Sequence, residues 1–230
     1  MYKRQIYYNE DYFTQNNINI ISVTEDELEA YNQANGTTYA PRGYAEYTVD
    51  AMPAAGLKTS KNLEGEEVVK VFNNLIPMSF LEVNTLSKYF TREYNKQSPS
   101  LYGVLNEWWF SHGWAVGGDC VKWDEDMGQY KFTLGDQQPN YLVTEAVTVN
   151  DTAYEAGDIL SYADRNWALD NPSSSVVSSL YELPSQYEQF REFCAWSQVT
   201  SKKVDDEVYG YGISPSPATL NNSSKVQYFT

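Results

Sequence analysis

The sequence predicts an α+β fold, and three observations support this prediction. Apolar residues recur at helical spacing through residues 66–112, a pattern typical of packed helices. After residue 113, apolar and polar residues alternate between Gly, Asn and Pro, as they do in strands and turns. The chain is 42% hydrophobic and 20% charged, which supplies enough apolar surface for a core. Its 230 residues suit one large domain or two small ones.

The first part of the chain is expected to form an N-terminal arm over residues 1–62. Alternation predicts a strand at 18–23, and a second strand is expected near 44–49. Thr24 with Glu27 three residues later matches a capping box, so a helix should follow as far as Gly36, a typical stop. The carboxylates at its start suit the positive end of the helix dipole and predict no metal site.

Three successive helices are expected to form a helical segment over about 66–112, inside a main α+β domain at 63–204. The run EEVVKVFNNLI at 66–76 places its apolar residues on one helical face. Ser79 with Glu82 matches a second capping box, for a helix that reaches about residue 94. Ser98 followed by Pro99 predicts the start of a third helix through Trp109.

The rest of the main domain is predicted to be β-rich and to close with a further helix. Strands are expected over residues 130–134 and 141–149, and Asn150-Asp151 suits a tight turn before a strand–turn–strand segment at 153–160. Residues 171–175 read as a loop. Ser185 with Glu188 predicts the capped start of the last helix.

Residues 205–230 are expected to form an extended C-terminal tail. The stretch from residue 210 onwards is polar and contains Gly and Pro, so it is predicted to be disordered on a free monomer and ordered against a partner. Removing residues 211–230 should then leave a folded monomer that fails to join its assembly.

The charge of the chain limits its partners. Lys and Arg total 16 against 31 Asp and Glu, which gives a formal net charge of −15. Nucleic-acid binding without sequence preference depends on neutralising phosphates with Lys and Arg, and anionic membranes attract the same residues. The pairs Lys3-Arg4 and Lys202-Lys203 are interpreted as ordinary solvated pairs. We therefore expect no sequence-independent nucleic-acid binding by the chain alone, no sequence-specific nucleic-acid binding and no membrane attachment.

Targeting signals and cysteine chemistry give little direction. The N-terminal residues MYKRQIYYNEDYF lack an apolar run, so no secretory signal peptide is expected, and no stretch is long and apolar enough to cross a membrane. The chain is therefore expected to stay in the cytoplasm where it is made. Cys120 and Cys194 stand among aromatic residues and are predicted to be buried free thiols.

Tyrosine is enriched, with 20 residues beside 6 Trp and 9 Phe. Tyr and Trp are favoured at protein interfaces because they offer large contact areas at low entropic cost. Tyr39, Tyr44 and Tyr47 stand in polar surroundings and are interpreted as contact surface rather than core. The residues predicted to contact neighbouring subunits are Tyr7, Tyr8, Tyr12, Tyr209, Tyr211, Tyr228 and Phe229.

No catalytic, cofactor-binding or metal-binding constellation is predicted. His112 is the only histidine and is interpreted as a packed side chain. The acidic run Asp124-Glu125-Asp126 lacks the spacing of an EF-hand and is interpreted as a solvated turn. The motifs GxGxxG, GxxxxGK[ST] and CxxC do not occur, so no cofactor is expected.

One alternative with chemistry stays open, namely carbohydrate binding or glycan hydrolysis. Glu107 stands beside Trp108 and Trp109, and Asp119 or Asp124 could supply the second carboxylate of a glycosidase. Trp114 and Trp167 could stack on sugar rings.

The style of the sequence resembles virion proteins of tailed bacteriophages, especially the crAss-like phages of gut Bacteroidetes. The resemblance is carried by the Tyr/Asn/Ser-rich segments, by TEDELEAYNQANG at 24–36, by VTVNDTAYEAGDILSY at 147–162 and by the aromatic-bearing tail. It implies a structural subunit of an oligomeric neck, ring (head–tail connector) or tail that contacts copies of itself and other virion proteins, with decoration of the capsid as the next choice. Assembly in the host cytoplasm and residence in the virion are expected, and in a ring an acidic lumen would let DNA pass.

Overall fold

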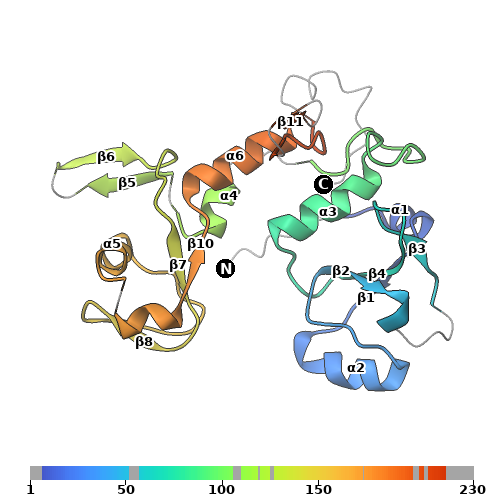
Figure 1. Cartoon of the computed structure of the whole chain (residues 1–230), viewed down its shortest axis with the longest axis horizontal. Coiled ribbons are helices and arrows are strands. Elements are labelled where there is room, and N and C mark those ends of the chain that lie inside the picture. Colours follow the sequence, from blue (N-terminus) through green and yellow to red (C-terminus); the bar gives the residue numbers. More distant parts are fainter. Residues whose placement is uncertain are drawn as a thin grey trace. The chain divides into compact units, whose positions relative to one another are not determined.

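The computed structural model describes residues 7–51, 57–105, 110–118, 120–124, 127–172, 174–198, 202–204 and 207–215. Within this part of the chain, helices and strands are mixed, which confirms the α+β class. The chain divides into two compact units (Figure 1). Unit 1 comprises residues 1–105 and 196–230, and unit 2 comprises residues 106–195. The predicted boundary at 62/63 lies between two paired strands of unit 1, and the three-part division stays a prediction.

Unit 1 is organised around a small mixed sheet. Its central strand β4 (Glu67–Asn73) pairs in parallel with β1 (Ile18–Ile21) and antiparallel with β2 (Tyr44–Thr48) and β3 (Ser60–Lys61). The strand order β1-β4-β2 leaves β2 at an edge. The strands expected at 18–23 and 44–49 are confirmed.

The helix predicted over residues 66–76 is wrong, because this segment is strand β4. Val68 to Asn73 are all buried, so the strand is covered on both faces. A strand of this kind is apolar at consecutive positions, and such a run also matches a helical face. The β-branched residues Val68, Val69 and Val71 favour the strand.

Alternate residues of β4 supply two hydrophobic clusters on opposite faces of the sheet. Phe72 belongs to a cluster with Phe13 and Phe90, under α1 (Glu10–Gln15) and α3 (Phe80–Phe90). Val69 and Val71 belong to the second cluster, under α2 (Leu28–Asn35). Figure 1 shows α3 and α2 on opposite sides of the sheet. The period of two along the strand thus gives unit 1 its layers.

The helix starts predicted from capping residues are largely confirmed. The Ser79 hydroxyl accepts from the N–H of Glu82, and the Glu82 carboxylate accepts from the N–H of Ser79, which completes a capping box at the start of α3. Before α2, residues Glu25–Glu27 form a 3₁₀ turn, and the Thr24 hydroxyl donates to the Glu27 carboxylate instead of capping an N–H. Gly36 ends α2 in the left-handed conformation, with a φ of 62°, which glycine commonly adopts at the end of a helix.

The third helix predicted from Ser98 is wrong for residues 98–105, and residues 106–109 lie outside the described chain. A Cβ atom at Gly103 would lie 1.9 Å from the carbonyl oxygen of Ser87 in α3. Packed helices keep their axes about 8–10 Å apart, so this segment passes α3 too closely to be helical. A short helix, α4 (Phe110–Ala115), follows in unit 2.

Residues 210–215 pack into unit 1, so the predicted disorder from residue 210 is wrong for this stretch. The carbonyl of Ile213 accepts hydrogen bonds from the N–H groups of Gly103 and Val104, at 2.9 and 3.1 Å. The Tyr94 hydroxyl donates to the Tyr211 carbonyl at 2.6 Å, and the Ile213 side chain is fully buried. Composition indicated disorder, but these contacts hold the backbone. Residues 216–230 lie outside the described chain.

In unit 2 the described residues form three two-stranded sheets and three helices. The strand pairs are β5 (Val121–Asp124) with β6 (Gln129–Phe132), β7 (Asn140–Val143) with β10 (Leu180–Leu183), and β8 (Val147–Val149) with β9 (Thr152–Tyr154). The helices are α4, α5 (Tyr162–Asp170) and α6 (Gln186–Trp196). A 3₁₀ turn (Ser175–Ser179) precedes β10. The strand expected over 141–149 is thus two strands in different sheets. Outside this unit, a fourth two-stranded sheet of the described chain joins β11 (Lys202–Val204) and β12 (Glu207–Tyr209).

The turn and cap predicted in unit 2 are confirmed. Asn150 and Asp151 join β8 and β9 with φ of 46° and 67°, the conformation of a type I′ hairpin turn. At the start of α6, the Ser185 hydroxyl accepts from the N–H of Glu188, whose carboxylate accepts from Ser185. The side chains of Val143, Val149, Leu160 and Ala168 form the buried cluster of this unit.

Two predictions about burial are wrong. Tyr39 and Tyr44 belong to the core clusters of unit 1 rather than to a contact surface, because their rings fill space between the sheet and the helices. The free thiol of Cys194 is exposed and that of Cys120 half-buried, although both stand among aromatic residues. Among the described residues, no helix is long and apolar enough to span a membrane.

Candidate interaction surface

The hairpin formed by β5 and β6 carries an apolar face that is left exposed within the described part of the chain. In the antiparallel register, Val121 lies opposite Phe132 and Trp123 lies opposite Tyr130. Side chains alternate along a strand, so these four residues share one face of the hairpin. We call this set (Val121, Trp123, Tyr130 and Phe132) the hairpin face.

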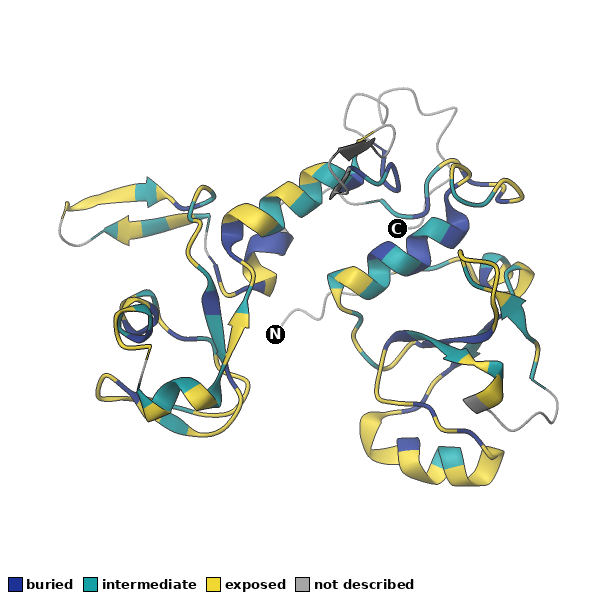
Figure 2. Ribbon diagram, in the orientation of Figure 1, coloured by how far each residue is buried: buried dark blue, intermediate teal, exposed yellow. Residues whose placement is uncertain are grey.

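The hairpin face is exposed over most of its area (Figure 2). The exposed fractions are 53% for Trp123, 71% for Tyr130 and 84% for Phe132, and Val121 is also exposed. If an aromatic side chain presents about 200 Å² when fully exposed, the three rings leave roughly 400 Å² uncovered. A patch of this size matches the largest apolar patches of soluble monomers, which are often functional.

The opposite face of the hairpin carries its cations and rests on α5. The ammonium groups of Lys122 and Lys131 lie 4.8 and 5.2 Å from the ring centroid of Tyr162, at the start of α5. The Lys131 ammonium also pairs with the Asp124 carboxylate at 3.1 Å. The hydrogen bond to Asp124 raises the pKa of Lys131, so this lysine stays charged at neutral pH. The charged face is therefore turned towards the protein and the apolar face away from it.

A buried ion pair fixes α5 beneath the hairpin. The guanidinium of Arg165 donates to the Asp136 carboxylate at 2.7 Å and lies 4.0 Å from the Tyr162 ring centroid. The side chain of Arg165 is 2% exposed. Because Arg165 and the two hairpin lysines all contact Tyr162, this ring links the hairpin to α5.

A second cluster of polar side chains lies inside unit 1. Glu46 of β2 accepts hydrogen bonds from the hydroxyls of Tyr44, at 3.2 Å, and Tyr89. Opposite Glu46 in the sheet, Lys70 is 3% exposed and places its ammonium 3.7 Å from the Tyr89 ring centroid. Burial lowers the pKa of Lys70 to about 8, although the nearby Glu46 opposes this shift. Burial also raises the pKa of both tyrosines. Lys70 itself is buried, although Tyr44 and Glu46 also line a surface hollow, and we interpret the cluster as structural.

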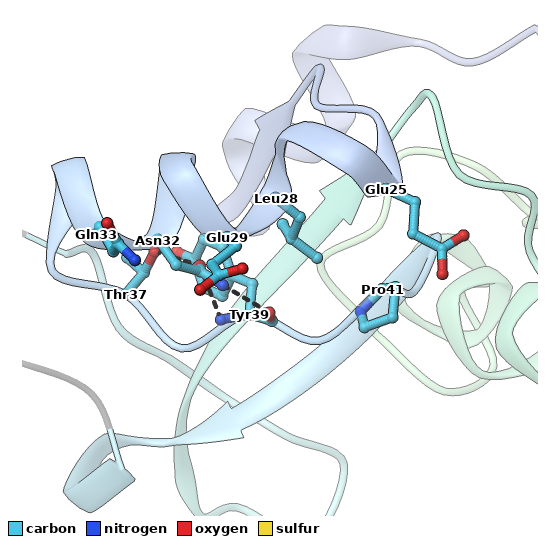
Figure 3. Close-up of a pocket in the computed structure, with 8 residues that line it drawn as sticks. All are labelled: Glu25, Leu28, Glu29, Asn32, Gln33, Thr37, Tyr39 and Pro41. Atoms are coloured by element: carbon cyan, nitrogen blue, oxygen red, sulfur yellow. Dashed lines mark hydrogen bonds between the residues drawn. The ribbon is translucent and has the colours of Figure 1, made fainter.

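Two shallow hollows open on the surface of unit 1. The larger, of about 380 Å³, lies between α2 and the loop at 37–41 (Figure 3). There the side-chain oxygen Oδ1 of Asn32 accepts hydrogen bonds from the hydroxyl of Thr37 and the backbone N–H of Tyr39. The side-chain nitrogen Nδ2 of Asn32 donates to the backbone carbonyl of Tyr39. The smaller, of about 300 Å³, lies between β2 and α3. The side chain of Asn32 is thus used to hold the loop and is not directed at a ligand.

The tyrosines predicted as interface residues have different environments. Tyr7 is 66% exposed, whereas Tyr8 and Tyr12 are half-buried against the cluster under α3. Tyr211 is half-buried, with the Lys88 ammonium 5.2 Å from its ring centroid. The side chain of Tyr209, and all of Tyr228 and Phe229, lie outside the described structure. Their contacts with neighbours stay a prediction.

The residues considered for glycan chemistry are not brought together in the described chain. Glu107, Trp108, Trp109 and Asp119 lie outside it, and Asp124 is engaged with Lys131. Trp114 is exposed, but Trp167 packs against the buried cluster of unit 2. Within the described residues, no three His, Cys, Asp or Glu side chains group closely enough to hold a metal ion.

The histidine has no catalytic environment that the structure shows. His112 is fully buried and meets the Phe193 ring edge-on, with centroids 5.4 Å apart. Burial lowers its pKa to about 4, so the ring is neutral at pH 7. The interpretation of His112 as a packed side chain is confirmed.

The sequence analysis missed the hairpin face. The pattern Val-x-Trp and Tyr-x-Phe shows that apolar residues share a face, and this signal was available. The same pattern usually marks a core-facing strand, so the pattern alone does not say that this face is open. Comparison with known proteins adds nothing to this description, since no family model, curated protein or solved structure matches the chain.

Proposed function

We propose that the chain is a structural subunit of a large oligomeric assembly and acts through protein–protein contacts. The observation that supports this function best is the exposed hairpin face, because apolar patches of this size mark contact surfaces. Burying such rings in an interface is strongly favourable, and Trp and Tyr are the residues that most often dominate binding energy. The resemblance in sequence style favours a neck, ring or tail protein of a tailed bacteriophage.

The electrostatics are consistent with this proposal. The net charge of −15 disfavours a role in gripping DNA and suits a ring whose lumen repels it. The ammonium groups of both hairpin lysines lie over the Tyr162 ring, and that of Lys131 is also paired with Asp124. A map of the ring lumen rich in Lys or Arg would contradict the lumen hypothesis.

Two experiments test the proposal. Mass spectrometry of purified particles of the encoding phage should find the chain as a stoichiometric component. Size exclusion with in-line light scattering should show a ring-sized oligomer, or a monomer that assembles when other virion proteins are added. A chain absent from particles and inert towards virion proteins would refute the proposal.

For the carbohydrate-binding alternative, the exposed rings of Trp123 and Tyr130 are further candidates beside the tryptophans considered from the sequence. These rings meet at 71°, so they do not present the single flat surface on which a sugar chain stacks. The hairpin face also has few hydrogen-bonding groups, whereas sugar recognition needs many. A polysaccharide screen that finds binding or hydrolysis would favour this alternative over the structural role.

A further inference from the structure

We infer that the hairpin face is a self-contact, through which two copies of the chain pack hairpin against hairpin about a two-fold axis. The inference rests on the proposed function, since it names one of the contacts from which the assembly would be built. The two hairpins would form the two layers of a small β-sandwich, with strand layers about 10 Å apart.

The chemistry of the hairpin face suits a second copy. A two-fold contact places the same residues against each other, so any charge on the face would meet its like. The four residues of the hairpin face carry no formal charge, and the charged side chains Lys122, Asp124 and Lys131 alternate onto the other face. At these four residues two copies meet no like charge, although each chain carries a net charge of −15 and Glu125 and Asp126 stand in the sequence between the two strands.

The geometry of the rings also suits packing against a similar surface. Trp123 and Tyr130 already meet edge-on, with centroids 5.0 Å apart. Edge-to-face contact is the preferred arrangement of aromatic pairs. Phe132, which pairs with Val121 across the hairpin and is 84% exposed, offers a further ring to the second copy.

The size of the face sets the strength of the contact. Two copies would remove roughly 800 Å² of aromatic surface from water, which is below the 1,200 Å² typical of stable interfaces. The contact is therefore weak, with a Kd in roughly the 10 µM to 1 mM range. Within an assembly, where copies are held together by other contacts, a weak contact of this kind is reinforced by high local concentration.

The two-copy contact predicts an unusual salt dependence. Like-charged chains repel at low ionic strength, and salt screens this repulsion. Dimerisation should thus become several-fold stronger between 50 mM and 500 mM NaCl. A basic partner on the same face would bind more weakly as salt rises, so the direction of the change separates the two occupants.

The test is sedimentation equilibrium of the full chain from 5 µM to 1 mM at both salt concentrations. The double variant Tyr130→Thr/Phe132→Thr keeps β-forming residues and should be monomeric throughout. The control Leu81→Ser removes an equally exposed apolar side chain, 75% exposed on α3 of unit 1, and should dimerise as the parent chain does. Circular dichroism confirms that each variant is folded.

A covalent readout checks the surface directly. Tyr130→Cys in a Cys120→Ser/Cys194→Ser background should form disulfide-linked dimers under mild oxidation near the Kd, while Leu81→Cys in the same background stays monomeric. A parent chain that is monomeric to 1 mM, a dimer that survives the double Thr variant, or a dimer that weakens with salt would each overturn the inference. So would binding of neutral phosphatidylcholine vesicles or glucan oligosaccharides by the hairpin face of a strictly monomeric chain.

The inference and the proposed function fail separately. If the parent chain is monomeric but the double Thr variant no longer enters phage particles, the hairpin face contacts a different virion protein, and only the self-contact is overturned. If the chain dimerises as expected but is absent from particles, the self-contact holds without the proposed function.

Discussion

Cutting the chain at two neighbouring points in its C-terminal segment should give opposite results. A chain that ends at residue 215 keeps the contacts of residues 210–215 with unit 1, whereas a chain that ends at residue 209 loses them. From composition, removal of residues 211–230 is expected to leave the fold intact. That truncation would delete the fully buried Ile213, so the chain ending at residue 215 is the one that should stay folded.

The magnitude follows from what the shorter chain leaves behind. Losing a buried Ile side chain costs about 2–4 kcal/mol, counting both lost burial and the space left behind. The N–H groups of Gly103 and Val104 lose their shared acceptor, the Ile213 carbonyl. Because the cut also removes the segment that covers these groups, water can replace the acceptor, and each lost hydrogen bond costs about 0.5–1.5 kcal/mol. The total is about 3–7 kcal/mol, comparable with the whole stability of a marginal domain, which is about 5–15 kcal/mol.

Urea unfolding followed by circular dichroism measures the effect. The chain ending at 215 should unfold with nearly the parent midpoint, and the chain ending at 209 should be largely unfolded in unit 1. The point variant Ile213→Ala should lie between them, about 2–4 kcal/mol less stable than the parent. Equal stability of the two truncated chains would refute the assignment of residues 210–215 to the fold.

Three further predictions concern unit 2. Burial lowers the pKa of His112 from 6.5 to about 4, so the free energy of unfolding should be constant above pH 6.5 and should fall by up to about 3 kcal/mol towards pH 4. This loss should be absent in His112→Leu. Urea midpoints measured across this pH range test both expectations. Burial alone would raise the pKa of Asp164, but hydrogen bonds from Tyr154, Ser161 and Asn150 outweigh this effect and lower the pKa. Asp164→Asn should therefore lower the free energy of unfolding by about 1–3 kcal/mol at pH 7. The difference in stability between variant and parent should shrink below pH 4, where the parent carboxylate protonates, and a difference that stays constant with pH would contradict this prediction. Asp136→Ala should lower the free energy of unfolding by about 3–5 kcal/mol, because it leaves the guanidinium of Arg165 buried without its carboxylate partner. The double variant Asp136→Ala/Arg165→Met should recover much of this stability in thermal unfolding. Losses that simply add in the double variant would contradict the prediction.

Local signals in the sequence predicted the helix caps and turns well, because these features depend on one or two residues whose side chain or backbone conformation is specific to them. Ser79 and Ser185 cap helices through side-chain hydrogen bonds that depend on residues three positions away. Gly36 and the Asn150-Asp151 turn need positive φ, which few residue types adopt. Helix α5 was missed, although Ser161 with Asp164 three residues later offers the same capping signal.

Predictions failed where the environment decides the outcome. The run around Val69 is apolar at successive positions, and only the layers on both faces of β4 make it a strand. The openness of the hairpin face likewise depends on Tyr162, which lies 30 residues or more from the hairpin strands and draws their lysines inward. The candidate site could thus be predicted as a two-sided hairpin, but not with its apolar side outward.

The path of the chain has a consequence for synthesis on the ribosome. Unit 1 is interrupted after residue 105 and is resumed only at residue 196, so unit 2 is complete before the last part of unit 1 exists. At translation rates of about 5–20 residues per second, the 110 residues from 106 to 215 take roughly 5–20 s to appear. During that interval the sheet and α3 of unit 1 have been synthesised but lack the buried side chain of Ile213. A chaperone-binding window should therefore open while unit 2 emerges and close when residue 215 leaves the exit tunnel.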